Sequence, residues 1–266
     1  MAATTREVRR GSTDDLLSSV RCMDATGIIF AGLDCDGDSI EEWNRWYDLE
    51  HVPPNVSMPG IMMGHRYVAT PDLHAVRVVD PASGFANKRG TFLTIYTLCG
   101  DPGNAFADMT VLRDKLYDGN RMTFPADKKA VREGDVLRMQ WAVADPSRSC
   151  LPEDVPFVGH TALLAVQRRG TDEVAAWYRD TWSPAVVALD GVHGVMSLTS
   201  DTREGLALDL VFIEGDTVAQ TAAIRAAAPH HADATIVLDA PFAFIDPLRY
   251  PFADAIRASD LPATVA

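Results

Sequence analysis

The chain has 266 residues, of which 47% are hydrophobic and 23% charged, a composition typical of a globular protein with a sizeable core. Its formal net charge of −13, without a Lys/Arg-rich block, argues against nucleic acid as a partner. No signal-peptide pattern and no run of about 18 apolar residues occurs, so we expect neither secretion nor a membrane-spanning helix. The four cysteines form no Cys-x-x-Cys pair, which indicates reduced thiols in a cytoplasmic protein.

The first unit is predicted to span residues 27–145. Its apolar pattern and turn signals predict strand, helix, strand, strand, helix and strand, in the order Gly27–Leu33, Ile40–His51, Ile61–Ala69, Thr91–Leu98, Ala105–Tyr117 and Val136–Ala144. Ser39 and Glu42 form a capping-box pattern at the start of the first helix. The residue before Pro53 is pushed out of the helical conformation, which predicts that this helix ends at His51.

Two segments of the first unit, 71–89 and 119–133, are rich in turn-forming and charged residues and are predicted insertions. Loops of this length often carry function, so both are candidates for determining specificity. Residues 1–26 and 246–266 are predicted terminal extensions, the latter as a strap over the surface. The segment Asp145–Pro156 contains three prolines and is predicted to link the two units.

The second unit is predicted to span residues 157–245 and to repeat the first. Trp46–Gly60 matches Trp177–Gly191 without gaps at an offset of 131, with Trp-Tyr, Pro and Gly in register. The predicted elements follow the same order, with strand Phe157–Val166, a helix from Thr171 or Asp172 to about Ser183, strands Val192–Thr199 and Leu206–Ile213, helix Val218–Ala228 and strand Thr235–Phe244. We therefore predict an α+β fold of two tandem ferredoxin-like β-α-β-β-α-β units.

The motif Trp46-Tyr47-Asp48-Leu49-Glu50-His51-Val52-Pro53, followed by Pro59-Gly60 and Arg66-Tyr67, resembles the first helix and second strand of the dimeric α+β barrel superfamily. EthD-like proteins are the most similar group. The resemblance implies that the antiparallel sheets of the two units pair into a barrel within one chain. A monomer would then suffice for the barrel, and a homodimer stays open.

This superfamily includes lyases, isomerases, dehydratases, cofactor-free oxygenases and proteins without known activity, so the resemblance alone does not decide function. Members with acid–base activity often carry a histidine in a His-x-Pro context at the end of this helix. The matching triplet is His51-Val52-Pro53, whereas the second unit reads Trp182-Ser183-Pro184. The resemblance therefore implies a catalytic histidine in the first unit.

One face of the first helix combines aromatic residues with a carboxylate. At about 100° per residue this face holds Trp43, Trp46, Tyr47 and Glu50, with His51 at its edge. If the face meets the sheet, Glu50 would be partly desolvated and its pKa raised toward the range useful for acid–base catalysis. Alternatively, Glu50 pairs with Arg66 or His65 and fixes the helix to the sheet, while the tryptophans pack in the core.

Alternation along the second strand places His65 and Tyr67 on one side and Gly64 and Arg66 on the other. Arg66 could bind a substrate carboxylate or phenolate, or be an exposed charge, and the other two could donate to an oxyanion. The candidate catalytic residues are therefore His51, Glu50, Tyr47 and Arg66, and the candidate substrate-binding residues are Trp43, Trp46, His65 and Tyr67.

The second unit has Thr181, Trp182 and Ser197 at the positions of Glu50, His51 and Arg66, so the polar set is replaced as a whole and one specialised site is predicted. No His-x-His, HExxH or nucleotide-binding signature occurs, so we predict neither a metal nor a cofactor. We predict a cofactor-independent acid–base enzyme of lyase, dehydratase or isomerase type for an apolar, aromatic or polycyclic small molecule. A cofactor-free monooxygenase and a non-catalytic binding protein are the alternatives.

Overall fold

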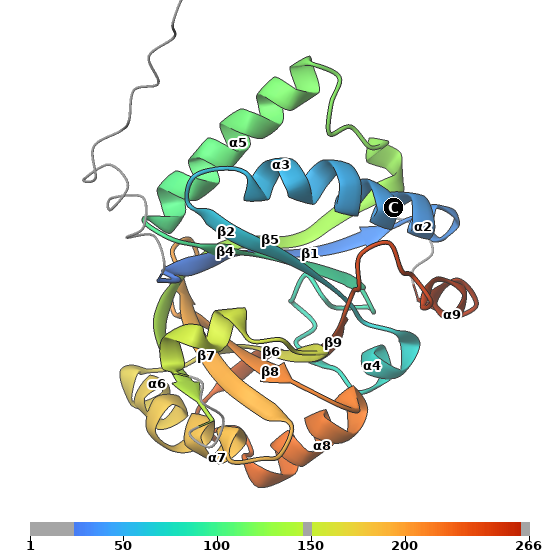
Figure 1. Cartoon of the computed structure of the whole chain (residues 1–266). Helices are drawn as coiled ribbons and strands as arrows, with labels where there is room; N and C mark the ends of the chain where they lie inside the picture. Colours follow the sequence, from blue (N-terminus) through green and yellow to red (C-terminus); the bar gives the residue numbers. More distant parts are fainter. Residues whose placement is uncertain (1–23, 146–150, 262–266) are drawn as a thin grey trace, which may run out of the picture.

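The computed structural model describes residues 24–145 and 151–261 (Figure 1). The strands are β1 Gly27–Cys35, β2 Ile61–Val68, β3 Val78–Val79, β4 Phe92–Leu98, β5 Lys129–Ala144, β6 Ala162–Arg169, β7 Val192–Ser200, β8 Leu206–Ile213 and β9 Thr235–Phe244. The α-helices are α2 Ile40–Trp46, α3 Val52–Val56, α4 Pro71–Ala75, α5 Pro102–Asp118, α6 Asp172–Trp177, α7 Ser183–Val187, α8 Thr217–Ala227 and α9 Ala253–Arg257. The predictions for Cys22, Cys150, most of 1–26, the first part of the linker and residues 262–266 concern parts of the chain outside the described residues.

The strands form one large antiparallel sheet in the order β2-β4-β1-β5-β7-β8-β6-β9-β3. An additional pairing joins β2 to β9 through Tyr67 with Phe244 and Val68 with Ala243, so the sheet closes on itself. The expected α+β class is confirmed. The strand, helix, strand, strand, helix, strand order occurs over β1 to β5 and again over β6 to β9, if the short β3 and α4 are set aside.

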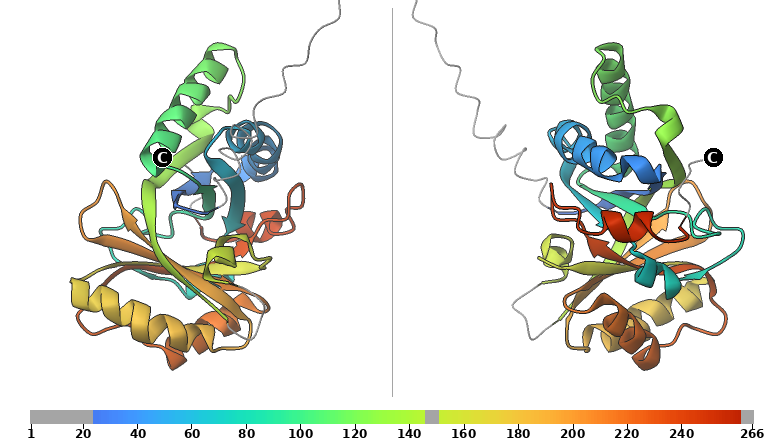
Figure 2. Two further views of the ribbon diagram at one scale, coloured as in Figure 1. Left: turned by 60° about the vertical axis from the view of Figure 1, so that its left-hand side comes forward. Right: turned by 90° about the vertical axis from the view of Figure 1, so that its right-hand side faces the viewer.

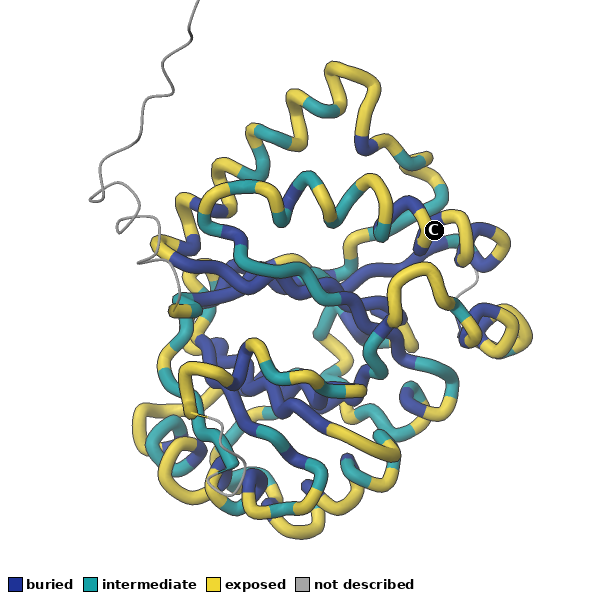
Figure 3. The backbone as a smooth tube through the Cα atoms, viewed as in Figure 1, coloured by how far each residue is buried: buried dark blue, intermediate teal, exposed yellow. Residues whose placement is uncertain are grey.

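Helices cover the outer surface of this closed sheet, and apolar side chains fill its interior. In Figure 1, α2, α3 and α5 lie over β1, β2, β4 and β5, while α6, α7 and α8 lie over the other half, and Figure 2 shows the same layers from two further sides. Strand alternation turns every second side chain inward, among them Ile28, Phe30, Leu93, Leu163, Leu208 and Phe242. The strands are accordingly the most continuously buried part of the chain in Figure 3.

The first helix continues through Pro53. The sequence had predicted that it ends at His51, and this prediction is wrong. Between α2 and α3 the residues Tyr47–His51 form a π-helical turn, in which the Val52 amide donates to the Tyr47 carbonyl. A proline in a regular helix lacks one donor and clashes with the carbonyl four residues earlier. The wider turn accommodates both defects, so the helix continues.

The second half contains the same feature, a π-helical turn over Tyr178–Trp182 just before Pro184. The capping box predicted at the start of the first helix is not formed, because the Ser39 side chain makes no capping bond. A short 3₁₀ turn over Gly37–Ser39 begins this region instead, and the Asp36 side chain accepts from the Asp38 amide.

The two segments expected to be insertions are structured. Segment 71–89 contains α4 and β3, which pairs with β9, and its Phe85 is 1% exposed within the interior core. In segment 119–133, β5 already begins at Lys129, so its last residues belong to the sheet. Only the second segment lies near the cavity described below.

The C-terminal segment packs against the first half of the chain, as a strap would. Phe252, Ile256 and Leu261 share an apolar cluster with residues of α2, and Arg257 pairs with Glu41. Among the described cysteines, Cys35 is a buried free thiol whose pKa is raised by burial, whereas Cys99 is disulfide-bonded. The prediction of reduced thiols is therefore wrong for Cys99. Within 24–145 and 151–261, no helix is long and apolar enough to cross a membrane.

Candidate functional site

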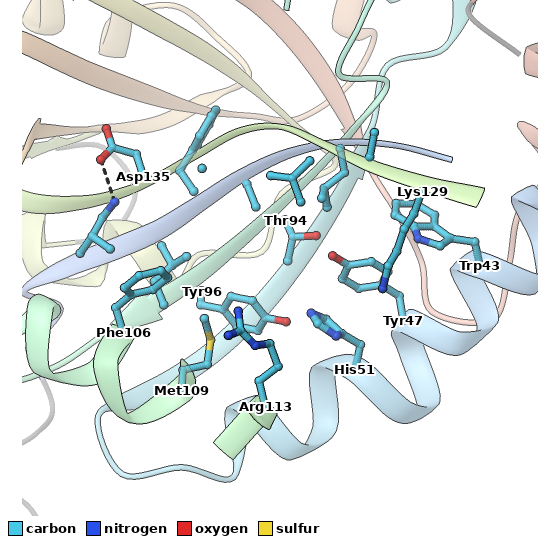
Figure 4. Close-up of a pocket in the computed structure, with 18 of the residues that line it drawn as sticks. Trp43, Tyr47, His51, Thr94, Tyr96, Phe106, Met109, Arg113, Lys129 and Asp135 are labelled. Carbon is cyan, nitrogen blue, oxygen red and sulfur yellow. Dashed lines mark hydrogen bonds between the residues drawn. The ribbon is translucent and has the colours of Figure 1, made fainter. Parts of the chain in front are cut away.

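A cavity of about 460 Å³ lies between the outer face of β1, β4 and β5 and the helices α2 and α5 (Figure 4). This volume is within the range of small-molecule sites. Its lining is mostly apolar or aromatic and includes Ile29, Leu33, Trp43, Trp46, Tyr47, His51, Thr94, Tyr96, Phe106, Met109, Arg113, Tyr117, Lys129 and Val136.

Two local periodicities build this cavity. In β1 and β4, the residues that alternate with the interior core face outward, and Ile29 and Tyr96 are examples. In α5, Phe106, Met109 and Arg113 follow at spacings of three and four and therefore share one helix face. Phe106 is 42% exposed, so α5 leaves the cavity open to solvent on that side.

His51 is held in the cavity as a neutral imidazole. Its ring centroid lies 4.8 Å from that of Trp46 and 4.4 Å from that of Tyr47. Burial, and then the cations Lys129 and Arg66, lower the pKa of His51 to about 3. Its buried Nδ1 atom has no hydrogen-bond partner among the described residues. The imidazole is thus partly desolvated, and its ring forms part of the cavity wall.

Two phenols accompany the imidazole. Burial raises the pKa of Tyr47 to about 12, against the opposing effect of Arg66, and it raises the pKa of Tyr96 as well. The Tyr96 hydroxyl accepts a hydrogen bond from Asn55 Nδ2 at 3.0 Å. Figure 4 shows this hydroxyl turned toward the His51 ring. Both phenols keep their protons near neutral pH and can donate hydrogen bonds to a ligand.

The carboxylate predicted for this site lies elsewhere. Glu50 is exposed and lines a separate depression with Arg45 and Phe124. The reason is the π-helical turn, which advances each residue by less than the 100° assumed for a regular helix and so rotates Glu50 off the aromatic face. Asp48 is the inward carboxylate, with a side chain only 5% exposed.

Arg66 holds the helix to the sheet and does not line the cavity. It is 4% exposed, pairs with Asp48 at 3.0 Å and lies 4.3 Å from the Tyr47 ring centroid. In the second half, Arg168 lies 3.9 Å from the Tyr178 ring, although it comes from a different strand. A guanidinium over this tyrosine is therefore common to both halves. At the position of Arg66 itself the second half has Ser197, so there the guanidinium comes from another strand.

His65 and Tyr67 lie on the opposite face of the sheet, in its interior. The Tyr67 hydroxyl is 2.8 Å from His160 Nε2, and the His65 ring is 5.6 Å from the His160 ring. Burial and the neighbouring His160 lower the pKa of His65 to about 4. These two predicted substrate-binding residues are thus separated from His51 by the sheet.

Of the predicted residues, Trp43, Trp46, Tyr47 and His51 therefore lie together at the cavity. Sequence reasoning missed Tyr96, Phe106, Met109 and Lys129. The outward positions of β4 and the single face of α5 could have indicated the first three. Lys129 gave no signal, because its segment was interpreted as an insertion. At the position of His51, the second half has Trp182, which is 1% exposed and donates to the Ala228 carbonyl at 2.8 Å.

No protein family and no curated protein matches the sequence. Solved structures are similar at low identity. A protein named "putative monooxygenase" from Fusobacterium nucleatum is 10% identical, with a TM-score of 0.47 and coverage of 84% of this chain and 94% of that chain. A DypB variant of Rhodococcus jostii RHA1 in complex with heme is 10% identical, with a TM-score of 0.47 and coverage of 88% and 96%.

An anthrone oxidase-like protein is 9% identical, with a TM-score of 0.43 and coverage of 85% of this chain and 94% of that chain. Similarity at this level carries no argument about function. The closed antiparallel sheet with helices on its outer surface is nevertheless the arrangement that the sequence motif implied for a dimeric α+β barrel.

Proposed function

We propose that the chain is a cofactor-independent enzyme of lyase, dehydratase or isomerase type that acts on an apolar, aromatic or polycyclic small molecule in this cavity. The observation that supports this most is the His51 imidazole, which is half-buried against aromatic rings, has a lowered pKa, and is unpartnered at Nδ1 within the described part of the chain. The EthD-like, tandem ferredoxin-like organisation belongs to the same proposal. It is supported by the repeated element order and by the two π-helical turns at an offset of 131.

In the proposed reaction, His51 accepts a proton from a carbon acid of the substrate. The electron pair moves onto a substrate oxygen, and the Tyr47 or Tyr96 hydroxyl donates a hydrogen bond to this oxyanion. His51 then returns the proton to another carbon or to a leaving group. Without a bound anion, an imidazolium is disfavoured by burial and by Lys129. An anionic intermediate supplies the missing countercharge and thereby raises the pKa of His51 during the reaction.

One observation favours non-catalytic binding as a second candidate. Within the described part of the chain, no carboxylate hydrogen-bonds to His51, and the carboxylate of Asp135 at the cavity is held by Arg203 at 2.7 Å. A general base is usually oriented by a third group. The same aromatic cavity could therefore hold a ligand without transforming it.

Hydrogen–deuterium exchange tests the proposal. We expect the protein to accelerate exchange of the acidic C–H protons of 2-tetralone in D₂O above the buffer rate, as followed by NMR. The variant His51→Gln should lose about a hundredfold of this acceleration, because general bases contribute at least that much. Binding, followed by tryptophan fluorescence, should persist, and Glu50→Gln should match the wild type in both assays.

The outcomes separate the candidate functions. Binding of 2-tetralone without accelerated exchange would favour the binding protein, and unchanged exchange in His51→Gln would remove His51 from the mechanism. Consumption of dioxygen with the same ketone, followed with an oxygen electrode, would favour the cofactor-free monooxygenase instead.

A further inference from the structure

The cavity carries a positive charge that the described residues do not neutralise. Arg66, behind the tyrosine, is paired with Asp48, and Arg113 on α5 is paired with Asp114 at 2.8 Å. Lys129 has no carboxylate within ion-pair distance anywhere in 24–145 or 151–261, and burial alone lowers its pKa. Of these three cations, Lys129 is therefore the one without a countercharge.

Lys129 is also held in place. It is the first residue of β5 and pairs in register with Cys35 of the neighbouring β1, which fixes its backbone in the sheet. Its Nζ lies 4.7 Å from the Trp46 ring centroid, and Figure 4 shows the side chain extending toward Tyr47 and His51. Half-burying an ammonium group without a carboxylate is costly, and a cation–π contact offsets only a part of that cost.

We propose that the cavity binds an aromatic carboxylate, with Lys129 as the residue that recognises its anionic group. This inference rests on the proposed function, because it names the ligand class of the same cavity. The ring system lies against the apolar wall formed by Ile29, Phe106 and Met109, and the carboxylate lies beside Lys129. The binding energy of the anion comes from neutralising a charge that the protein leaves unpaired.

The other charged residues near the cavity are compatible with binding of an anionic ligand. Asp135, a carboxylate in the lining, already accepts from Arg203, Ser200 and Thr202. Its charge is thus partly offset before a ligand arrives, although Arg203 also pairs with Glu133 at 2.9 Å. The net charge of −13 repels anions from the molecule as a whole, so recognition depends on short-range contacts within the cavity.

Matched pairs of ligands test this inference. The probes are 2-naphthoate with 2-naphthamide and 9-anthroate with its amide, which differ in charge and keep the same rings. Affinities are measured at pH 7 by tryptophan fluorescence and calorimetry for the wild type, Lys129→Met and Lys128→Met. Lys128 is adjacent, is absent from the cavity lining and gives the same change in net charge.

We expect the wild type to bind each carboxylate at least tenfold more tightly than its amide. In Lys129→Met this preference should fall to about one, with amide affinity unchanged within twofold, whereas Lys128→Met should keep it. Equal binding of carboxylate and amide by the wild type would overturn the inference and leave the proposed function intact. A preference that survives in Lys129→Met would overturn the assignment to Lys129. If none of the four probes binds, the aromatic cavity function itself fails.

Discussion

Removing the charge of Asp48 should strongly destabilise the protein. Its Oδ1 accepts from Arg66 at 3.0 Å, and its Oδ2 accepts from the Leu248 amide at 2.8 Å and the Tyr250 hydroxyl at 2.6 Å. The variant Asp48→Asn keeps the shape of the side chain but leaves the guanidinium, 4% exposed, without its countercharge. Breaking a buried ion pair from one side costs about 3–5 kcal/mol of unfolding free energy.

Urea unfolding at pH 7, followed by tryptophan fluorescence, measures this cost. The matched control is Glu50→Gln, which removes one negative charge from an exposed position two residues away. Its effect should lie within about 0.5 kcal/mol of zero. A loss below about 1 kcal/mol for Asp48→Asn, or an equal loss for Glu50→Gln, would refute the assignment of Asp48 as the inward carboxylate.

Three further perturbations have defined outcomes. Tyr250→Phe removes one hydrogen bond to the Asp48 carboxylate and should cost about 1.5–3 kcal/mol in urea unfolding. Trp182→Ala empties a fully buried site and should cost about 3–5 kcal/mol in the same assay. For His51, burial lowers the folded-state pKa to about 3 from 6.5, so the unfolded chain takes up a proton first as the pH falls. The free energy of unfolding should therefore decrease between about pH 6.5 and 3, by up to about 1.4 kcal/mol per pH unit from this residue. The variant His51→Gln should lack this contribution to the pH dependence.

Each of these results has a clear contrary. If the double variant Tyr250→Phe/Asp48→Asn loses the sum of the unfolding free energies lost by the two single variants, the two side chains act independently. That result would contradict their hydrogen bond. A small effect of Trp182→Ala would mean that the second half tolerates a cavity at this position. Equal pH profiles for wild type and His51→Gln, measured at pH 7 and pH 5, would show that the imidazole is hydrated.

The secondary structure was largely predictable because it depends on local pattern. Apolar runs and turn residues gave the strands to within a few residues, and β2 and β4 are examples. Strand β5 was placed too late, since its first residues, Lys129–Glu133, are mostly polar and resemble a loop. The predicted end of the first helix at His51 was wrong, because a π-helical turn that no local pattern indicates accommodates Pro53.

The candidate site was predictable only in part for the same reason. The aromatic helix face and His51 follow from spacing near 3.6 residues per turn, and they line the cavity. Glu50, expected on the aromatic face, is exposed, and Asp48, for which the sequence predicted no role, is the carboxylate that pairs with Arg66. The position of Asp48, the partner of Arg66, also depends on the C-terminal segment, because the Leu248 amide and the Tyr250 hydroxyl donate hydrogen bonds to its carboxylate.

The sequence by itself determined the class of fold, the repeated order of strands and helices, and the position of the aromatic helix in the first half of the chain. These features depend on residue periodicity, which acts between neighbours in the chain. The tertiary structure decided which strands close the sheet, that α5 stands off the sheet to leave a cavity, and that Lys129 joins His51 there. Such contacts join residues far apart in the chain, and their energies come from burial and charge pairing that no local pattern records.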